Sequence, residues 1–289
     1  MRFSLLVAAL TAGSLLACGS DPEPLPTSTE LGGVRPTELQ VPRNIVKGKK
    51  YPLVVVLHGY GADGLLQYSY FGVRNWVDRG EVFALAPDGL VDANNSHFWN
   101  ADPACCAFGS QKPDDSAYIA GLIDEAVANW PIDPKRVFVI GHSNGSFMAY
   151  RLACDHADKI AAIAGLAGAA TSVPAQCKPS QPISVLHMHG TADTIVPYGG
   201  GGSLTAPGAE ASVAYWAGKN GCGTGLATGT TMDFDNAVPG AETVTKQTAG
   251  CPATGAADLW TLNGSAHIPS VNDAFSPAIE AWLLAHARP

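Results

Sequence analysis

The segment Gly141-His142-Ser143-Asn144-Gly145 constrains the fold of this chain more than any other feature. Apolar and β-branched residues at 137–140 lead into it, and a helix-compatible segment, 147–153, follows it. A Gly-x-Ser-x-Gly pattern between a strand and a helix predicts a turn so tight that the serine adopts a strained backbone conformation. We therefore expect Ser143 to present its hydroxyl group above the edge of a sheet, in a nucleophile elbow.

A nucleophilic serine of this kind must be followed along the chain by an Asp or Glu and then by a His. His267 lies in a turn-rich loop after the strand-like segment 259–262, whereas His286 ends an amphipathic terminal segment, so we expect His267 to be the base. Asp193 follows the apolar segment 183–190, at the carboxyl end of an expected strand, where catalytic groups collect in open α/β sheets. The other acidic candidates lie before this strand or in a polar insertion: Asp155, Asp158, Asp233 and Asp235.

These three residue types are needed together. A serine hydroxyl is a weak nucleophile until an imidazole takes its proton, and a carboxylate holds the imidazole in the correct tautomer. We assign Ser143 as the nucleophile, His267 as general base and then acid, and Asp193 as the orienting carboxylate.

The negative oxygen that forms on attack needs main-chain N–H donors. One is expected from Asn144, the residue after the nucleophile, and the other from the loop after the apolar segment 51–58. In that loop Tyr60 is the first choice and Gly61 the second, and we expect His58 to support the loop by hydrogen bonding rather than to act as a base.

Three side chains are candidates for substrate contact: Tyr60, Trp99 and His142. Trp99 has two interpretations, because it lies in a long irregular segment, 90–113, without periodicity. Its ring either packs this segment onto the core or lines an acyl or sugar pocket, where aromatic rings stack on ligands.

Several motifs recur in the order found in one known family. They are 54–63, 98–101 followed by Cys105-Cys106, 141–145, 150–154, 187–193 and His267. In these motifs the chain resembles the secreted polyhydroxybutyrate depolymerase and feruloyl esterase group of α/β-hydrolases, which is related to carbohydrate esterases. The resemblance covers about residues 37 to 286.

The resemblance implies a serine esterase with Ser143, Asp193 and His267 as its catalytic residues, without a cofactor or a metal. It implies as substrates feruloyl or acetyl esters of polysaccharides, or aliphatic polyesters such as polyhydroxybutyrate, and it favours the pocket interpretation of Trp99. Two departures are Ser146, where a second glycine is more usual, and Ile268-Pro269-Ser270 in place of Trp-Pro after the histidine. The second departure puts substrate choice in doubt more than mechanism.

The N-terminal residues match the pattern of an export signal. Arg2 and a short apolar run precede Leu15-Leu16-Ala17-Cys18, which matches a bacterial lipobox, so we expect residues 1–18 to be a lipoprotein-type signal ending at the lipidated Cys18. Ordinary cleavage after Gly19 is the alternative. Residues 19–36 are rich in Pro, Ser and Thr and predict a tether, and 37–289 predict one catalytic domain at the bacterial cell envelope or secreted.

Six cysteines remain after Cys18, and an even number in an exported chain predicts disulfides. Cys222 and Cys251 bracket an insertion and are the expected first pair, and four others would form two more bridges of open pairing: Cys105, Cys106, Cys154 and Cys177. A zinc site is the rival interpretation, but no Cys-x₂-Cys pair has matching His spacing.

The charge balance limits the partners. Lys and Arg total 17 against 25 Asp and Glu, a net charge of −8, which argues against nucleic acid or an anionic membrane surface as a partner. We expect a monomer that contacts an ester substrate, and a membrane only through its lipid anchor. A serine peptidase on the same fold and a non-catalytic surface binding protein are the rival functions.

Alternating strand and helix patterns predict a mostly parallel sheet with helices on both faces. Residues 65–79 predict one helix with Leu65 and Leu66 among its core positions, and residues 199–257 predict an insertion that is either a flap near the active site or decoration.

Overall fold

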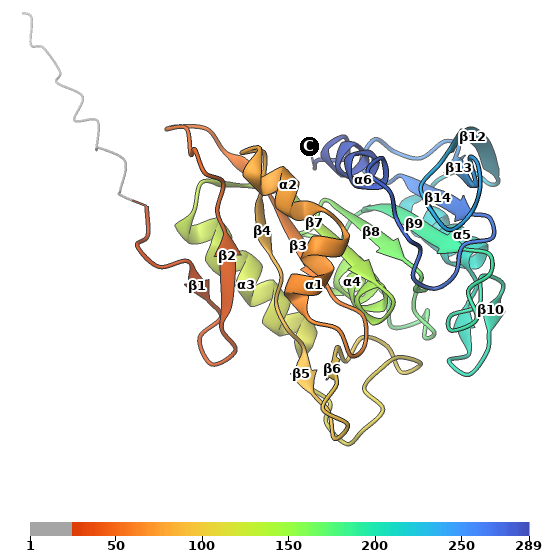
Figure 1. The fold of residues 1–289 in the computed structure, drawn as a ribbon, viewed down its shortest axis with the longest axis horizontal. Helices are drawn as coiled ribbons and strands as arrows, with labels where there is room; N and C mark the ends of the chain where they lie inside the picture. The colour runs from red at the N-terminus through yellow and green to blue at the C-terminus, as the bar shows by residue number, and fades with distance from the viewer. Residues whose placement is uncertain (1–24, 289) are drawn as a thin grey trace, which may run out of the picture.

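A ten-stranded sheet runs through the domain in the computed structural model, which describes residues 25–288 (Figure 1). Its strands lie in the order β1 (Glu30–Leu31), β2 (Thr37–Gln40), β4 (Phe83–Leu85), β3 (Tyr51–Leu57), β7 (Ile132–His142), β8 (Ala162–Leu166), β9 (Ser184–Gly190), β14 (Ala257–Leu262), β13 (Thr243–Thr248) and β12 (Leu226–Met232). The strands from β4 to β14 are parallel, and the edges on both sides are antiparallel. The predicted α/β class with a mostly parallel sheet is confirmed.

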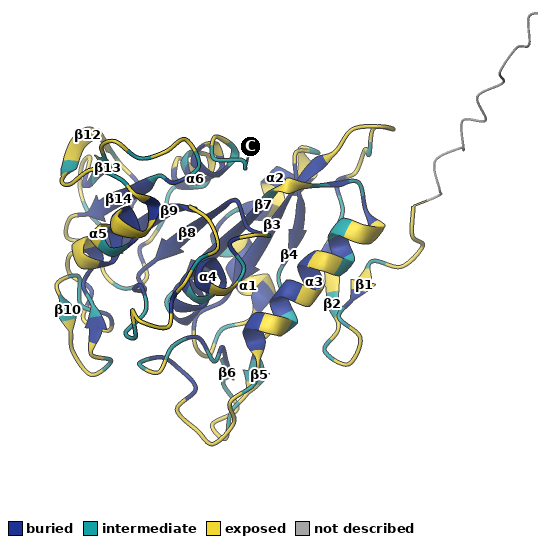
Figure 2. Ribbon diagram, turned by 180° about the vertical axis from the view of Figure 1, so that it is seen from behind, coloured by how far each residue is buried: buried dark blue, intermediate teal, exposed yellow. Residues whose placement is uncertain are grey.

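Helices cover both faces of the sheet (Figures 1 and 2). One face carries α3 (Asp115–Asn129), α4 (Asn144–Asp155) and α5 (Ala209–Asn220), and the other carries α1 (Gly64–Tyr70), α2 (Val73–Asp78) and α6 (Phe275–Leu284). Along β3, Leu53, Val55 and Leu57 pack towards α3 and α4, whereas Val54 and Val56 pack towards α2 and α6. A central parallel strand buries both of its faces, which explains the continuous apolar run at this position.

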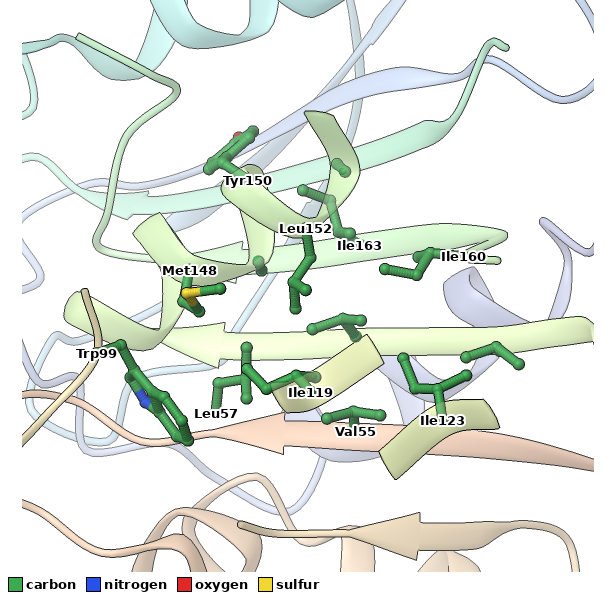
Figure 3. Close-up of a cluster of buried hydrophobic side chains, with 14 of the residues drawn as sticks. Val55, Leu57, Trp99, Ile119, Ile123, Met148, Tyr150, Leu152, Ile160 and Ile163 are labelled. Carbon is green, nitrogen blue, oxygen red and sulfur yellow. The ribbon is translucent and has the colours of Figure 1, made fainter. Parts of the chain in front are cut away.

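The core between the sheet and α3 is built from aliphatic side chains (Figure 3). Ile119 and Ile123 of α3 lie over Val55 and Leu57 of β3, and all four are almost completely buried. In Figure 2 the helix α3 shows a buried inner stripe and an exposed outer stripe, the pattern of an amphipathic surface helix.

The predicted single helix over 65–79 is wrong in two respects. The chain breaks into α1 and α2 at Gly72, whose φ of 68° is left-handed. Leu65 and Leu66, predicted in the core, are 62% and 61% exposed. Asp63 caps α1 by accepting a hydrogen bond from the Leu66 N–H at 2.7 Å, and this start turns Tyr68, rather than the two leucines, towards the sheet.

Most of the segment 199–257 belongs to the central fold, so neither predicted role, a flap or a surface addition, describes it. It contributes β12 and β13, which extend the sheet beyond β14, and helix α5, which packs on β14 and β9. Only its first part forms a small separate hairpin, of β10 (Gly200–Gly201) and β11 (Ala206–Pro207). A second small hairpin, of β5 (Leu90–Val91) and β6 (His97–Phe98), lies in the long segment 90–113.

The folded domain begins before the predicted boundary at residue 37. Leu31 is buried and pairs with Thr37 in the sheet, and Arg35 forms an ion pair of 2.8 Å with Asp115 of α3. Residues 30–36 are therefore part of the domain rather than tether. The predicted signal 1–18, with Cys18, lies outside the described residues, and within 25–288 no helix has the length and apolar character that a membrane crossing requires.

Disulfides join all six cysteines of the domain in pairs. Cys222 is bonded to Cys251, as expected from the insertion that they bracket. The pairing that the sequence left open is Cys105 with Cys106 and Cys154 with Cys177.

Candidate active site

Ser143 lies in the turn between β7 and α4, at the carboxyl edge of the parallel strands. Its backbone has φ 52° and ψ −119°, a conformation that non-glycine residues rarely adopt. The Ser143 N–H donates a hydrogen bond of 2.8 Å to the carbonyl oxygen of Leu166, the last residue of the neighbouring strand β8. The sequence-based expectation of a strained serine between strand and helix is confirmed.

The two glycines of the motif are required by close contacts. A Cβ atom at Gly141 would lie 2.2 Å from the carbonyl oxygen of Gly145, and a Cβ atom at Gly145 would lie 2.2 Å from that of Leu57. Both distances are far below van der Waals contact, so only glycine allows the turn to close and α4 to approach β3.

Ser143, His267 and Asp193 form one hydrogen-bonded series, although they come from three separate segments. The Ser143 Oγ lies 2.9 Å from Nε2 of His267, and Nδ1 of His267 lies 2.7 Å from Oδ2 of Asp193. A carboxylate only accepts, so Nδ1 carries the proton and Nε2 is free to accept the serine proton. Ser143 and His267 are half-buried, and Asp193 is buried.

Asp193 is held as an anion by N–H donors on both oxygens. Its Oδ1 accepts hydrogen bonds from the N–H groups of Ile195 at 2.8 Å and Val196 at 2.9 Å. Its Oδ2 accepts from His267 and lies 3.2 Å from Nε2 of His189. Burial alone would raise the pKa of Asp193, but the hydrogen bonds from His189 and His267 outweigh it and hold the pKa well below its usual range.

His142 supports His267 and is not placed as a substrate contact, which corrects the expectation from sequence. It is 7% exposed, and its Nε2 donates to the main-chain carbonyl oxygen of His267 at 2.9 Å. The two rings lie 5.0 Å apart. Burial lowers the pKa of His142 to about 4, so the ring is neutral at neutral pH.

The loop after β3 packs against the nucleophile turn. A Cβ atom at Gly59, the residue before Tyr60, would lie 3.5 Å from Cβ of Ser143. Within 25–288 neither the N–H of Tyr60 nor that of Asn144 has a hydrogen-bond acceptor. The second choice, Gly61, is wrong because its N–H donates to the carbonyl oxygen of His97 at 2.9 Å.

Comparison with known proteins places the chain in a family. The phospholipase/carboxylesterase family matches residues 44–206, a range that contains Ser143 and Asp193. The chain belongs to this family. The resemblance to esterases of the α/β-hydrolase fold, expected from the sequence motifs, is therefore confirmed.

Individual relatives of this phospholipase/carboxylesterase chain carry esterase names. A putative esterase NocK of Nocardia uniformis subsp. tsuyamanensis is 32% identical over 149 residues, which is 52% of this chain and 42% of that protein. A probable feruloyl esterase C of Aspergillus terreus is 28% identical over 213 residues, which is 68% of this chain and 72% of that protein. Feruloyl esterase B of Piromyces equi is 34% identical over 134 residues, which is 43% of this chain and 24% of that protein.

The chain thus spans less than half the length of the first curated relatives that it matches. Among solved structures, the acetyl xylan esterase from Aspergillus awamori superposes with a TM-score of 0.61 at 16% identity, over 86% of this chain and 94% of that one. This likeness shows the fold.

Within this family fold, Trp99 packs the long segment onto the core, and the pocket interpretation is wrong. Its side chain is 0% exposed, so a substrate cannot reach it. The indole N–H donates to the carbonyl oxygen of His58 at 3.1 Å, and its ring lies 4.8 Å from the His58 ring (Figure 3 shows Trp99 in the core). The Asn144 side chain bonds to both the N–H and the carbonyl of Trp99, at 2.7 and 3.0 Å.

His58 stabilises the loop, as expected. Its Nδ1 donates to the carbonyl oxygen of Gly59 at 2.8 Å, and its Nε2 accepts from the N–H of Gly89 at 2.9 Å. Burial lowers its pKa, which keeps the ring neutral and able to accept at Nε2. Two loops beside the nucleophile are tied together in this way.

The loop that carries His267 has further supports that sequence reasoning missed. Tyr70 donates its hydroxyl hydrogen to the carbonyl oxygen of Pro269 at 2.9 Å, and Asp235 accepts from the N–H of Ser270 at 3.0 Å. Asp235 was set aside as a catalytic acid, and its 1% exposure fits this structural role.

Exposed apolar side chains lie on the segments that bear the site. They are Tyr60, Phe108, Ile195 and Ile268, and we call them the apolar rim. The Tyr60 and Phe108 rings meet edge to face, 5.8 Å apart, and the Tyr60 hydroxyl donates to Asp92. Exposed apolar groups beside a nucleophile favour an apolar or aromatic ligand. Sequence reasoning named Tyr60 as a candidate for substrate contact and missed Phe108.

A separate cavity of about 580 Å³ lies beside α4, lined by Asn100, Lys112, Tyr150 and Arg151 among others. Ser143, Asp193 and His267 are not among its lining residues. Across the part of the chain that the structure describes, no three His, Cys, Asp or Glu side chains are grouped so that they could hold a metal ion.

Proposed function

We propose that this chain is an exported serine carboxylic-ester hydrolase that acts through an acyl-enzyme intermediate. The observation that carries the proposal is the series Ser143–His267–Asp193, with distances of 2.9 and 2.7 Å, together with the main-chain N–H groups of Tyr60 and Asn144, which have no acceptor among residues 25–288. Such a series is what acyl transfer from an ester requires.

In the first step the Ser143 Oγ attacks the ester carbonyl carbon while its proton passes to Nε2 of His267. The carbonyl oxygen becomes negative and accepts hydrogen bonds from the N–H groups of Tyr60 and Asn144. The intermediate then expels the alcohol, which takes the proton from His267, and leaves the acyl group on Ser143.

In the second step a water molecule attacks the acyl carbon and gives one proton to His267. The bond to Oγ breaks, the acid leaves, and His267 returns the proton to Ser143. Asp193 stays ionised throughout, because its hydrogen bonds hold its pKa far below neutral pH.

As substrates we propose feruloyl or acetyl esters of polysaccharides. Relatives named feruloyl esterase, and the structural likeness to an acetyl xylan esterase, support this class. The apolar rim supports an aromatic or apolar acyl group, since the Tyr60 and Phe108 rings are exposed and lie against each other. Aliphatic polyesters such as polyhydroxybutyrate are the alternative substrate.

The proposal of export rests on the disulfides, which persist in oxidising compartments. The lipobox ending at Cys18 supports attachment to the bacterial cell envelope through a lipid. We propose that the enzyme acts as a monomer whose partner is the ester substrate.

The test is hydrolysis of p-nitrophenyl acetate and butyrate, methyl ferulate and a polyhydroxybutyrate suspension by the chain and its Ser143→Ala variant. We expect Ser143→Ala to lower ester turnover by about 10⁶-fold. Ser146→Ala is the matched control, because Ser146 Oγ is buried three residues later and has no partner among residues 25–288.

Each rival has its own outcome. Turnover of no ester by the unaltered chain would favour a binding protein, and cleavage of an amide analogue would favour a peptidase. Equal activity of Ser143→Ala and the unaltered chain would show that the nucleophile is misassigned.

A further inference from the structure

A buried chain of hydrogen bonds continues from Asp193 into the core, away from Ser143. His189 Nε2 lies 3.2 Å from Asp193 Oδ2, and His189 Nδ1 lies 3.0 Å from His187 Nε2. His187 Nδ1 lies 2.7 Å from the hydroxyl of Tyr150. Both histidines belong to β9, and Tyr150 belongs to α4.

These side chains are almost completely buried. His187 and His189 are 0% exposed and Tyr150 is 1% exposed. Buried polar groups are costly unless they are hydrogen-bonded, and apolar residues of similar size would fill the same space without that cost. The catalytic steps proposed above do not use any of these three side chains.

With neutral rings, one arrangement of protons fits the whole series. His189 Nε2 faces the carbonyl oxygen of Val196 at 2.7 Å as well as Asp193, and both only accept, so Nε2 carries the proton. His189 Nδ1 must then accept from His187 Nε2, and His187 Nδ1 must accept from the Tyr150 hydroxyl. Each donor therefore points along the series towards Asp193. Burial lowers the pKa of His187 well below its usual value, which keeps that ring neutral.

The series also connects the helix α4 to the strand β9, whose relative position sets the distance between the nucleophile and the carboxylate. Ser143 directly precedes the first residue of α4, and Tyr150 lies about two turns further along the same helix. Asp193 follows the end of β9, which carries the two histidines. The hydrogen bonds thus tie the helix of the nucleophile to the strand that precedes the carboxylate.

We propose that Tyr150, His187 and His189 are positioning residues that set the orientation of Asp193 towards His267. The inference rests on the proposed function, because it assumes that His267 and Asp193 are catalytic. The single Nε2–H of His189 lies 2.7 Å from the Val196 carbonyl oxygen and 3.2 Å from Oδ2 of Asp193, so it stands beside the oxygen that accepts from His267 and draws on part of its negative charge.

The first test replaces Tyr150 by Phe, which removes one hydroxyl and keeps the ring. We expect kcat for p-nitrophenyl acetate to fall about tenfold with KM within about twofold, because His187 and His189 lose the donor that orders them. Tyr51→Phe is the matched control, since Tyr51 is also buried and its hydroxyl is also hydrogen-bonded. It is the first residue of β3, at the end of that strand away from the active site. We expect Tyr51→Phe to leave kcat unchanged.

The second test compares His189→Leu with His189→Gln. Leu removes the donor, so we expect kcat to fall about 100-fold, and Gln, which offers an N–H near Nε2, should recover most of it. In His189→Leu the full charge of Asp193 is available to His267, so the acidic limb of kcat/KM should move to higher pH. The other titratable groups near His267, namely His142 and Asp193, are unaltered in both variants.

Several results would overturn the inference: equal kcat for Tyr150→Phe and Tyr51→Phe, no recovery with Gln, or an unshifted acidic limb in His189→Leu. A melting temperature measured for each variant separates loss of fold from loss of orientation. If Ser143→Ala abolishes turnover while these variants behave as the unaltered chain, only the positioning role fails. If Ser143→Ala retains turnover, the proposed function fails as well.

Discussion

His142 donates a hydrogen bond from Nε2 to the main-chain carbonyl oxygen of His267, 2.9 Å away. The residue before the nucleophile therefore holds the backbone of the base. Two hydrogen bonds thus join the nucleophile turn to the residue His267, one from the His142 ring to its carbonyl oxygen and one between Ser143 and its ring. The bond from His142 requires a proton on Nε2 and a ring that tolerates burial, and a neutral imidazole satisfies both.

The lowered pKa of His142 predicts that the fold loses stability in mild acid. Its pKa is about 4 in the folded chain, against an ordinary value of 6.5, so below about pH 6.5 the unfolded chain binds a proton that the folded chain does not. The stabilisation is complete above the ordinary pKa and is lost as the pH falls towards the folded value. We expect the free energy of unfolding to fall by about 2 kcal/mol between pH 7 and pH 5 from this residue alone. Urea unfolding at both pH values measures it.

His142→Gln is the control, because a glutamine amide keeps a donor near the carbonyl of His267 and does not titrate. The loss of stability between the two pH values should be smaller in this variant by about the same 2 kcal/mol. Burial lowers the pKa of His58 and His187 as well, so part of the acid sensitivity should remain. An identical pH dependence in both proteins would contradict the assignment to His142.

Replacement of Trp99 should act on stability rather than on substrate choice. The side chain is 0% exposed and bonds to His58, so Trp99→Ala leaves a cavity and should lower the free energy of unfolding by about 3–5 kcal/mol. Any loss of kcat/KM should be similar for p-nitrophenyl acetate and methyl ferulate. A selective rise in KM for the ferulate would instead restore Trp99 to the pocket.

The local rules of sequence predict the nucleophile turn and the strands that carry it. Ser143 lies where the strand, glycine and helix pattern requires, and Asp193 and His267 follow in the order and at the strand ends expected. These features depend on short-range backbone geometry and on apolar runs of residues, both of which are visible in a single chain.

Features that depend on tertiary contact could not be predicted in this way. Leu65 and Leu66 look like core residues, but the cap at Asp63 sets which face of α1 turns inward. The strand β12 is almost entirely exposed and rich in Thr, so it lacks the apolar alternation that marks a strand. It forms because an edge position needs only backbone partners from β13.

The residues that hold the site from behind could not be predicted for a related reason. His187 and His189 are two residues apart on one strand, which predicts a shared face but not the partner that they meet. Only the packing of α4 on the sheet brings Tyr150 to His187. In the same way Trp99 is aromatic in a long loop, and its burial depends on the path of that loop over the core.

Phe108 should select for aromatic acyl groups. Its exposed ring meets that of Tyr60 in the apolar rim, so Phe108→Ala removes apolar surface that an aromatic acyl group could contact. We expect KM for methyl ferulate to rise about tenfold, since an aromatic contact contributes on the order of 1 kcal/mol or more, while KM for p-nitrophenyl acetate changes little.

Val46→Ala is the matched control for this change. Val46 is exposed and lies in the loop before β3, at the opposite end of that strand from Tyr60. It should leave both KM values unchanged. Equal KM shifts for the two esters in Phe108→Ala would contradict an aromatic contact.

Two of the disulfides close loops of similar length but differ in exposure. Cys154–Cys177 spans 23 residues and Cys222–Cys251 spans 29, so each should stabilise the folded chain by about 3 kcal/mol through the unfolded state. Cys154 and Cys177 are buried, whereas Cys222 and Cys251 are partly exposed at the antiparallel edge of the sheet.

A mild reductant should therefore cleave Cys222–Cys251 first, because a thiolate must reach the sulfur atom that it attacks. We expect an early fall in melting temperature of about 5–10 °C, with ester turnover kept, since this disulfide lies at the far edge of the sheet from Ser143. In the variant Cys222→Ser/Cys251→Ser the early fall should be absent and the starting temperature already lower. Thiol labelling with peptide mapping identifies the cysteines released, and early labelling of Cys154 and Cys177 would contradict this order.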